Sequence, residues 1–317
     1  MKTKAIILAA GKGSRMKSDT LKVLHNVAGK PILQYVVDAV EKCGIEEIFV
    51  VVGHQAEKVK SQVKGKNITF VTQEDQLGTG HAVMQVEPYI CGKDQSTIIV
   101  LAGDCPLINP ETIGSLLDRH QESNASVSIL STKMEDPATY GRILRGRMGT
   151  VIGIKEAKDC SADEYKINEI NTGIYAFHQH ALCESLKLIT TNNAQQEYYL
   201  TDVIHIIKSK GDVVEALCIP DSDQAVGINT RMDLAKINEI IYQKTNINLM
   251  KSGVTIVDPK TTFIDGTVQI GQDTIIEPSV VIKGNTIIGK NVTIRSFSYI
   301  EDTTILDDTV VTQHSIK

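Results

Sequence analysis

A strict six-residue period in the last part of the chain constrains its fold more than any other sequence feature. Eight aliphatic residues follow one another at this spacing, and Thr312 takes the next position: Ile264, Ile270, Ile276, Ile282, Ile288, Ile294, Ile300 and Leu306. This period is typical of a hexapeptide β-helix, whose stacked coils bury one aliphatic residue per repeat in a continuous core. With three hexads per triangular coil, we expect a short left-handed parallel β-helix of about three coils over residues 253–317.

The predicted solenoid has no capping element at its end. The chain finishes with Ser315-Ile316-Lys317 and no terminal helix follows, so the last coil at 311–317 is expected to be exposed. Either a partner covers this coil or the chain is a truncated form. The only histidine after residue 252, His314, is interpreted as a turn residue of that terminal coil.

The first 229 residues predict an α/β domain. Short β-branched runs alternate with helical patterns up to about Asp104, which is typical of parallel βαβ units. We expect strands at 5–8, 48–52, 68–71, 98–101, 127–131, 170–177 and 213–219, with helices at 31–43, 80–86, 110–121 and near 197–210. The fold class is therefore a Rossmann-like domain with a mostly parallel sheet (1–229), a connector helix (230–252) and the β-helix.

Composition excludes several classes of function. The chain has 317 residues, a formal net charge of −5, 4% aromatic residues and no Trp, and no Lys/Arg-rich run. These features argue against nucleic-acid binding. No apolar stretch approaches the roughly 18 residues of a membrane span, and the apolar start at 5–11 is too short for a signal peptide. Six cysteines without a C-x-x-C pair predict free thiols in a reducing cytoplasm.

The strongest local signal is a Gly/Lys/Arg loop after the first expected strand. Gly11 and Gly13 allow close backbone approach to a ligand, and Arg15 and Lys22 supply positive charge for a polyphosphate. The loop does not match the dinucleotide-binding fingerprint, because Met16 stands where the third glycine belongs, and it lacks the P-loop pattern. Taken alone, it could equally be a structural turn.

Several further motifs follow in order: residues 8–15 with Lys22-Val23-Leu24-His25, then 76–82, Gly103-Asp104, 140–143, 169–173 and 192–195. Together they resemble the N-acetylglucosamine-1-phosphate uridylyltransferase domain of the bifunctional bacterial uridylyltransferase and glucosamine-1-phosphate acetyltransferase family. The resemblance extends over essentially the whole chain. It implies a Mg²⁺-dependent enzyme that converts UTP and N-acetylglucosamine-1-phosphate to UDP-N-acetylglucosamine and pyrophosphate for cell-wall precursor synthesis, and by analogy a homotrimer formed through the β-helix.

The chemistry of this reaction is largely positioning and charge neutralisation. Asp104 follows an apolar strand at the edge where open α/β sheets bind ligands, and is the natural metal carboxylate, although a turn before Pro106 would also explain it. The resemblance implies Asn229 as the second Mg²⁺ ligand. Without the resemblance, an N-cap of the following helix is preferred for Asn229. The expected catalytic residues are Arg15, Lys22 and Asp104.

The resemblance also implies positions for substrate binding. Gln73 offers an amide that can donate and accept on one edge, which suits uracil, although a surface glutamine is an equal alternative. The expected substrate-binding positions are Leu8, Ala9, Ala10, Gly11, Gly13, Lys22, Gln73, Gly78, Thr79, Ala102, Gly103, Asp104, Gly141, Glu156, Asn171, Tyr199, Thr201 and Asn229. Since the phosphate is already ionised, no general base is required. We therefore expect structural roles for His25, His54 and His81.

Two departures from the family pattern predict altered affinity without loss of the reaction. Thr20-Leu21 replaces the usual Leu-Pro before Lys22, and Ala102 stands where many members have Tyr. The acetyl-CoA site of the family lies in later coils that do not match here, so we expect no acetyltransferase activity. Two alternatives remain: a related transferase using dTTP or glucose-1-phosphate, and a regulatory or scaffold protein in which the first domain only senses nucleotide.

Overall fold

The computed structural model describes residues 2–92, 95–312 and 315–316, the last two by their backbone only. The chain divides into two compact units. Unit 1 contains the residues up to Leu24 together with Ile32–Asn229, and unit 2 contains His25–Pro31 together with the chain from Thr230 onward. Each unit is described by itself below.

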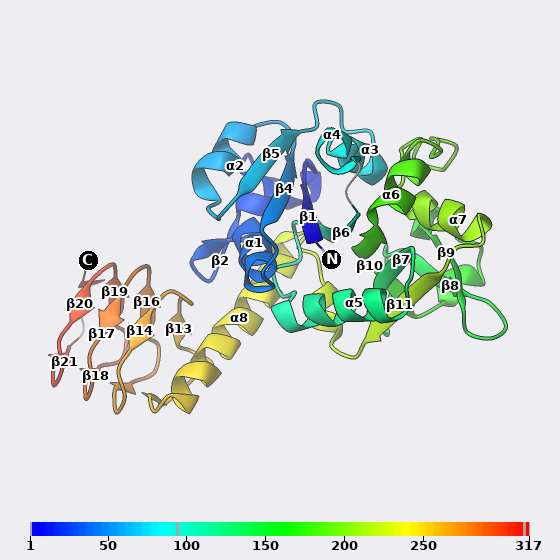
Figure 1. The fold of residues 1–317 in the computed structure, drawn as a ribbon. Coiled ribbons are helices and arrows are strands. Elements are labelled where there is room, and N and C mark those ends of the chain that lie inside the picture. The colour runs from blue at the N-terminus through cyan, green and yellow to red at the C-terminus, as the bar shows by residue number, and fades with distance from the viewer. Residues whose placement is uncertain (1, 93–94, 313–314, 317) are drawn as a thin grey trace. The chain divides into compact units, whose positions relative to one another are not determined.

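Unit 1 is built on a mostly parallel sheet with the strand order β11-β7-β10-β6-β1-β4-β5 (Figure 1). The strands are β1 (Lys2–Ala9), β4 (Glu47–Val52), β5 (Ile68–Thr72), β6 (Ser96–Ala102), β7 (Val127–Lys133), β10 (Glu169–His178) and β11 (Val214–Ile219). Strand β10 runs antiparallel to both of its neighbours. The hairpin of β8 (Arg142–Arg145) and β9 (Val151–Lys155) extends the sheet from β10. This agrees with the predicted fold class.

Helices cover both faces of the sheet because each strand in its centre is apolar on both sides. One core joins the sheet to α1 (Ile32–Lys42), α2 (Ala56–Gln62) and α5 (Pro110–Glu122). The core on the other face includes α3 (Thr79–Met84), α4 (Glu87–Ile90), α6 (Gln179–Leu186) and α7 (Thr201–Ser209). Alternate residues of one strand supply both cores, as Ile6 and Ile7 of β1 show.

The predicted elements of unit 1 are all present, with shifts of a few residues at their ends. The largest shift is in the helix predicted near 197–210, which begins at Thr201. Helices α2, α4 and α6 were not predicted. Two of these are short, and a helix of one or two turns leaves too few periodic apolar positions to be recognised.

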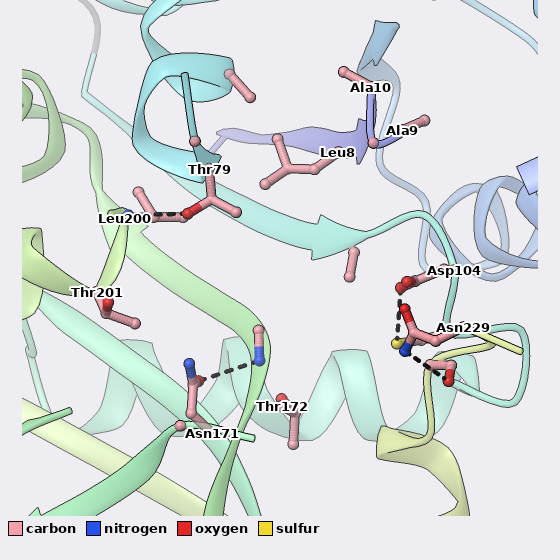
Figure 2. A pocket seen from close by; sticks show the side chains of 18 of the residues that line it. Leu8, Ala9, Ala10, Thr79, Asp104, Asn171, Thr172, Leu200, Thr201 and Asn229 are labelled. Carbon is pink, nitrogen blue, oxygen red and sulfur yellow. Dashed lines mark hydrogen bonds between the residues drawn. The ribbon is translucent and has the colours of Figure 1, made fainter. Parts of the chain in front are cut away.

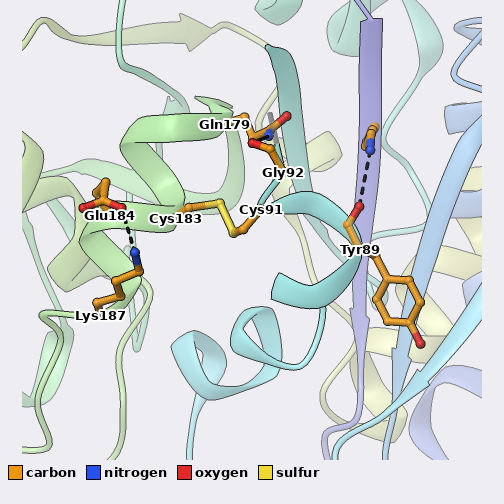
Figure 3. The surroundings of a disulfide bond; sticks show 8 residues. Tyr89, Cys91, Gly92, Gln179, Cys183, Glu184 and Lys187 are labelled. Atoms are coloured by element: carbon orange, nitrogen blue, oxygen red, sulfur yellow. Dashed lines mark hydrogen bonds and ion pairs between the residues drawn. A yellow bond between two sulfur atoms is a disulfide. The ribbon is translucent and has the colours of Figure 1, made fainter. Parts of the chain in front are cut away.

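The sequence-based prediction of six free thiols is wrong for two of the cysteines. Cys91, directly after α4, and Cys183, in α6, form a disulfide with their Cα atoms 5.9 Å apart (Figure 3). They are 92 residues apart, and only the packing of α4 and α6 on the same face of the sheet brings them together. Their spacing therefore carries no signal. The other four cysteines, Cys43, Cys105, Cys160 and Cys218, are free.

Unit 2 begins with α8 (Arg231–Lys251), whose bounds are close to the connector helix expected from the sequence. Thr230 is its N-cap and accepts a hydrogen bond from the backbone N–H of Asp233, while the Asp233 side chain accepts one from the Thr230 N–H. This reciprocal pair satisfies two of the backbone donors that a helix N-terminus leaves unpaired. Thr230 alone therefore accounts for the start of the helix.

A small hairpin from the N-terminal half of the sequence also belongs to unit 2. Strands β2 (Asn26–Val27) and β3 (Lys30–Pro31) flank a turn in which Ala28 and Gly29 both have positive φ. The Ala28 N–H donates to Oδ1 of Asn238 in α8 at 2.9 Å. A Cβ atom on Gly29 would lie 2.5 Å from Asp265 of the solenoid, so only glycine fits this approach.

The hexapeptide region forms three stacks of short parallel strands, the arrangement of a left-handed β-helix (Figure 1). The strands are β12 (Thr255–Ile256), β13 (Phe263–Ile264), β14 (Gln269–Ile270), β15 (Ile275–Ile276), β16 (Val281–Lys283), β17 (Ile287–Ile288), β18 (Thr293–Ile294), β19 (Tyr299–Glu301), β20 (Thr304–Ile305), β21 (Val310–Val311) and β22 (Ser315–Ile316). The isoleucines of the six-residue series fill its core from Ile264 to Ile300. His314 lies outside the described residues.

The predicted phase is wrong after Ile300. Strand partners are 18 residues apart from Ile264↔Ile282 to Ile282↔Ile300, but Ile288 pairs with Ile305 and Ile294 with Val311, which are 17 residues apart. Neighbouring strand residues face opposite sides, so this one-residue shortening turns Ile305 inward (7% exposed) and leaves Leu306 74% exposed. Val311 likewise replaces Thr312 as the buried residue.

Across the described ranges, no helix combines the length and the apolar character needed to cross a membrane.

Candidate active site

Unit 1 contains a cavity of about 690 Å³ at the carboxyl ends of β1 and β6. Open α/β sheets bind ligands at this edge, and the volume lies within the range of small-molecule sites. Most of the predicted site residues line it: Leu8, Ala9, Ala10, Gly11, Lys22, Gln73, Gly78, Thr79, Ala102, Asp104, Gly141, Glu156, Asn171, Thr201 and Asn229. Figure 2 shows Asp104 and Asn229 side by side at one end, with Asn171 and Thr201 farther along.

The end near Asp104 gathers two oxygen groups around one cation. The ammonium of Lys22 pairs with Oδ2 of Asp104 and also donates to Oδ1 of Asn229 at 3.2 Å. Nη2 of Arg15 donates to the same Asn229 oxygen at 3.0 Å. Residues from three distant parts of the sequence therefore meet at this point, as the resemblance implies.

The local fold explains how Asn229 reaches this position. Thr230 caps α8, so Asn229 is not the helix cap that was weighed as the alternative. The Ile228 N–H donates to the backbone oxygen of Asp104 at 2.9 Å, which ties the two segments together. A Cβ atom on Gly227 would lie within 3.4 Å of the Asp104 carboxyl, so glycine leaves that side of the carboxylate open.

The loop after β1 is held open by contacts at both ends. Nε2 of Gln76 donates to the backbone oxygen of Ala10 at 2.7 Å, and a Cβ on Gly13, where φ is +61°, would collide with the Lys22 side chain at 2.6 Å. Gly13 is therefore required so that the loop can pass close to Lys22. The backbone and the cationic side chains of Lys12 and Lys22 face the cavity together.

The far end of the cavity is polar and acidic. Glu156 accepts a hydrogen bond from the Thr201 hydroxyl at 3.0 Å, and Nδ2 of Asn171 donates to the Tyr175 hydroxyl at 2.6 Å. Burial raises the pKa of Glu156, and the nearby Asp159, Asp202 and Glu197 carboxylates act in the same direction. Hydroxyl groups of a ligand would find a carboxyl, an amide and a hydroxyl at this end.

Four predicted site residues lie outside the cavity lining. Arg15 acts only through Asn229, and Gly13 only shapes the loop. Gly103 is tied to the backbone of Leu8, whose oxygen its N–H contacts at 2.9 Å. The side chain of Tyr199 is 6% exposed and packs away from the cavity, while the next residue, Leu200, lines it and donates its N–H to Thr79.

Several lining residues were not predicted. Gln76 lies inside a motif that was recognised, so its position in the loop was a usable signal. Cys105 follows Asp104, and burial together with that carboxylate raises the pKa of its thiol well above the usual value. The others that were missed are Lys12, Val23, Ala82, Thr139, Tyr140, Thr172, Gly173, Tyr175, Glu197, Leu200, Ala225 and Gly227. Their inclusion depends on side-chain direction, which no local pattern specifies.

Two family models match the chain. The MobA-like NTP transferase domain matches residues 5–167, and the bacterial transferase hexapeptide (six repeats) matches residues 267–302. The chain is 48% identical over 313 residues to the "Bifunctional protein GlmU" of Enterococcus faecalis, which covers 99% of this chain and 68% of that protein. The protein of the same name from Geobacillus sp. is 47% identical, covering 100% of this chain and 68% of the relative.

The chain belongs to the GlmU family. Membership makes it a nucleotidyltransferase with hexapeptide repeats, consistent with a UDP-N-acetylglucosamine diphosphorylase of cell-wall precursor synthesis, and it confirms the resemblance and the enzyme class predicted above. GlmU relatives are about half again as long, because the chain spans 68% of their length.

A solved structure shares the fold with this GlmU family member. A putative glucose-1-phosphate thymidylyltransferase from Bacillus anthracis, crystallised with sucrose, superposes with a TM-score of 0.61 at 23% identity, covering 75% of this chain and 94% of that one. At this identity the likeness describes the fold only.

Proposed function

We propose that the chain is a Mg²⁺-dependent uridylyltransferase that converts UTP and N-acetylglucosamine-1-phosphate to UDP-N-acetylglucosamine and pyrophosphate. The observation that carries this proposal is the polarity of one continuous cavity. Lys12 and Lys22 line it together with Asp104 and Asn229, and Glu156, Asn171 and Thr201 line it as well. A sugar nucleotide has the matching asymmetry, with anionic phosphates on one side and hydroxyl groups on the other.

The donor set near Lys22 fits a divalent cation of the magnesium type. Asp104 and Asn229 present a carboxylate and an amide oxygen, both hard ligands, and already converge on one positive charge, the ammonium of Lys22. No cluster of three or more His, Cys, Asp or Glu side chains suited to a metal was found among the described residues. Mg²⁺ fits such a sparse set because it usually retains water and binds substrate phosphates. When bound, it would neutralise charge on the phosphates.

The reaction requires in-line displacement at phosphorus. An oxygen of the sugar phosphate forms a bond to the α-phosphorus of UTP, and the bond from that phosphorus to the pyrophosphate oxygen breaks. Lys22 would bind the phosphates and balance their charge, while Arg15 would hold Asn229 in place. Glu156, Asn171 and Thr201 would orient the sugar, which lowers the entropic cost of bringing the two substrates together.

The remaining predictions keep the same basis. Residues 1–229 would carry the transferase, 230–252 the connector and 253–317 a β-helix that forms a homotrimer. We propose that this polypeptide has no acetyltransferase activity, which an assay with glucosamine-1-phosphate and acetyl-CoA tests directly. The cytoplasm remains the proposed compartment, where nucleotide and sugar phosphate would be supplied.

Pyrophosphate release tests the proposed function. Wild type with Mg²⁺, UTP and N-acetylglucosamine-1-phosphate should release pyrophosphate, and substitution of UTP by dTTP or of the sugar by glucose-1-phosphate should lower kcat/KM. The Asp104→Ala variant should lose at least about 100-fold in kcat/KM. Asp118→Ala, a change of the same type at an exposed position on α5, should retain activity. Full activity in Asp104→Ala would contradict the role of Asp104.

A further inference from the structure

His81 connects the cavity to a chain of hydrogen bonds that the proposed reaction does not explain. It lies in α3, and its Nδ1 is 3.0 Å from Nε2 of Gln73. On the other side of the ring, Nε2 of His81 is 3.1 Å from Nε2 of Gln85. The ring also lies against Tyr198, with the centroids 6.2 Å apart. His81 is thus held between two side-chain amides.

The orientation of the Gln73 amide follows from a backbone carbonyl. Its Nε2 is 3.2 Å from the oxygen of Gly78, which also accepts the N–H of Ala82 at 3.1 Å. A carbonyl oxygen can only accept, so the amide nitrogen of Gln73, and not its oxygen, must face Gly78. This leaves one N–H of the amide directed at Nδ1 of His81.

The state of the imidazole then follows. To accept this hydrogen bond, Nδ1 must carry no proton, so the proton of the neutral ring is on Nε2. Gln85 competes for the opposite tautomer, because its own nitrogen also faces the ring and donates to the His81 backbone oxygen at 3.1 Å. A neutral imidazole can accept at only one nitrogen.

Burial decides between the two glutamines. Gln73 is 3% exposed, whereas Gln85 lies at the half-buried surface of the same helix as His81. An unmade hydrogen bond costs more at the buried group, and a partly exposed amide can turn and be solvated. Gln73 therefore keeps its bond to Nδ1, and Gln85 turns its oxygen to the Nε2–H of His81.

We infer that His81 is a positioning residue for base specificity: it holds the Gln73 amide so that only its oxygen is presented to the nucleotide base. Both N–H groups of Gln73 are used within the protein, and the side chain lines the cavity. An acceptor alone matches the ring N–H of uracil or thymine. It meets a lone pair at the corresponding nitrogen of cytosine, so CTP is rejected.

This inference rests on the proposed function, since it assigns Gln73 to the base of the nucleotide. It changes the role of His81, which the sequence analysis gave as structural. Without an acceptor at this position the Gln73 amide can rotate, and its N–H groups then become available to the ring nitrogen of cytosine.

Three variants test the inference through the ratio of kcat/KM for UTP to that for CTP. His81→Phe, which keeps a ring but no acceptor, should lower this ratio at least about ten-fold. His81→Asn, whose side-chain oxygen can take the place of Nδ1, should restore most of it. Gln85→Met should leave the ratio unchanged. Equal losses with both nucleotides in His81→Phe would mean that His81 is merely structural and would overturn the inference.

A measurement on the wild-type protein covers the case in which His81→Phe fails to fold. Long-range ¹H–¹⁵N correlation spectra of the His81 ring should show an unprotonated Nδ1 and a protonated Nε2, and a proton on Nδ1 would overturn the inference. If wild type releases no pyrophosphate with any substrate pair, the proposed function fails. The same UTP to CTP ratio, taken from dissociation constants, then decides the role of His81.

Discussion

His120 makes the stability of this protein depend on pH through a single buried side chain. It lies on α5, is 5% exposed, and shares a hydrogen bond with the hydroxyl of Ser128 at 3.0 Å. Burial, with a smaller contribution from His178, lowers the pKa of His120 from 6.5 to about 4. The folded state therefore holds this ring neutral where the unfolded chain would already protonate it.

The sign of the effect follows from the depressed pKa. The stabilisation is complete above pH 6.5 and is lost as the pH falls toward about 4, by up to about 3 kcal/mol. Urea unfolding at pH 7.5, 6, 5 and 4 should show this loss. His120→Gln, which cannot take up a proton, should remove this component of the pH dependence. An identical pH profile in the variant would contradict the assignment.

At the residue scale, the sequence predicted the charged part of the site better than its walls. Asp104 and Lys22 could be recognised because each follows a strand end or glycine loop, where local pattern determines position. Tyr175 and Cys105 could not, because their contribution depends on which face of a twisted strand or turn meets the cavity. Tyr199 was placed wrongly for the same reason: its neighbour Leu200 faces the cavity instead.

At the scale of elements, the end of the β-helix offers a direct test of its register. The six-residue series predicts that Leu306 is buried, but the structure buries Ile305. Ile305→Ala should therefore lower the free energy of unfolding by about 2 kcal/mol or more, and Leu306→Ala should change it by less than about 0.5 kcal/mol. Thermal unfolding of the two variants beside wild type measures the difference. The opposite order would support the unbroken period.

A period identifies a solenoid but not a missing residue within it. The shortened turn lies between Ile300 and Ile305, where Asp302 adopts a φ of +48°. Its Oδ1 accepts the N–H of Asn285 in the coil below at 2.8 Å. This contact depends on the stacking of coils, so it was invisible in a linear series of residues.

The disulfide between α4 and α6 predicts a redox dependence of stability. Opening a crosslink of 92 residues should lower the free energy of unfolding by about 2–4 kcal/mol. Cys183→Ser should show this loss without reductant and no further loss with it. Alkylation of unfolded, unreduced protein should modify the four free cysteines only. Modification of all six would show that the pair is reduced in solution.

At the scale of the whole molecule, the hairpin of β2 and β3 makes unit 2 discontinuous in sequence. Its Ala28 N–H bonds to Asn238, and Gly29 lies against Asp265, both in the C-terminal part. When residues 1–229 and 230–317 are produced as separate chains, we expect the second to co-purify with the first. Co-expression with an affinity tag on the first fragment measures this association.

A substitution at the hairpin provides the control for that association. Gly29→Val should reduce co-purification, because its side chain would collide with Asp265 and cannot easily adopt the positive φ. Gly114→Ala, with open space around its Cβ on α5, should not. Equal recovery with both variants would mean that the hairpin does not hold the fragments together.

The discontinuity also sets a condition for exchanging parts between relatives. Recombination at residue 229 looks like a clean exchange between two domains, yet it would separate a foreign α8 and solenoid from the seven residues, His25–Pro31, against which they are packed. A chimera that preserves this packing must carry two inserts from the same parent. The gene for this fold therefore has no single crossover point that transfers the C-terminal unit intact.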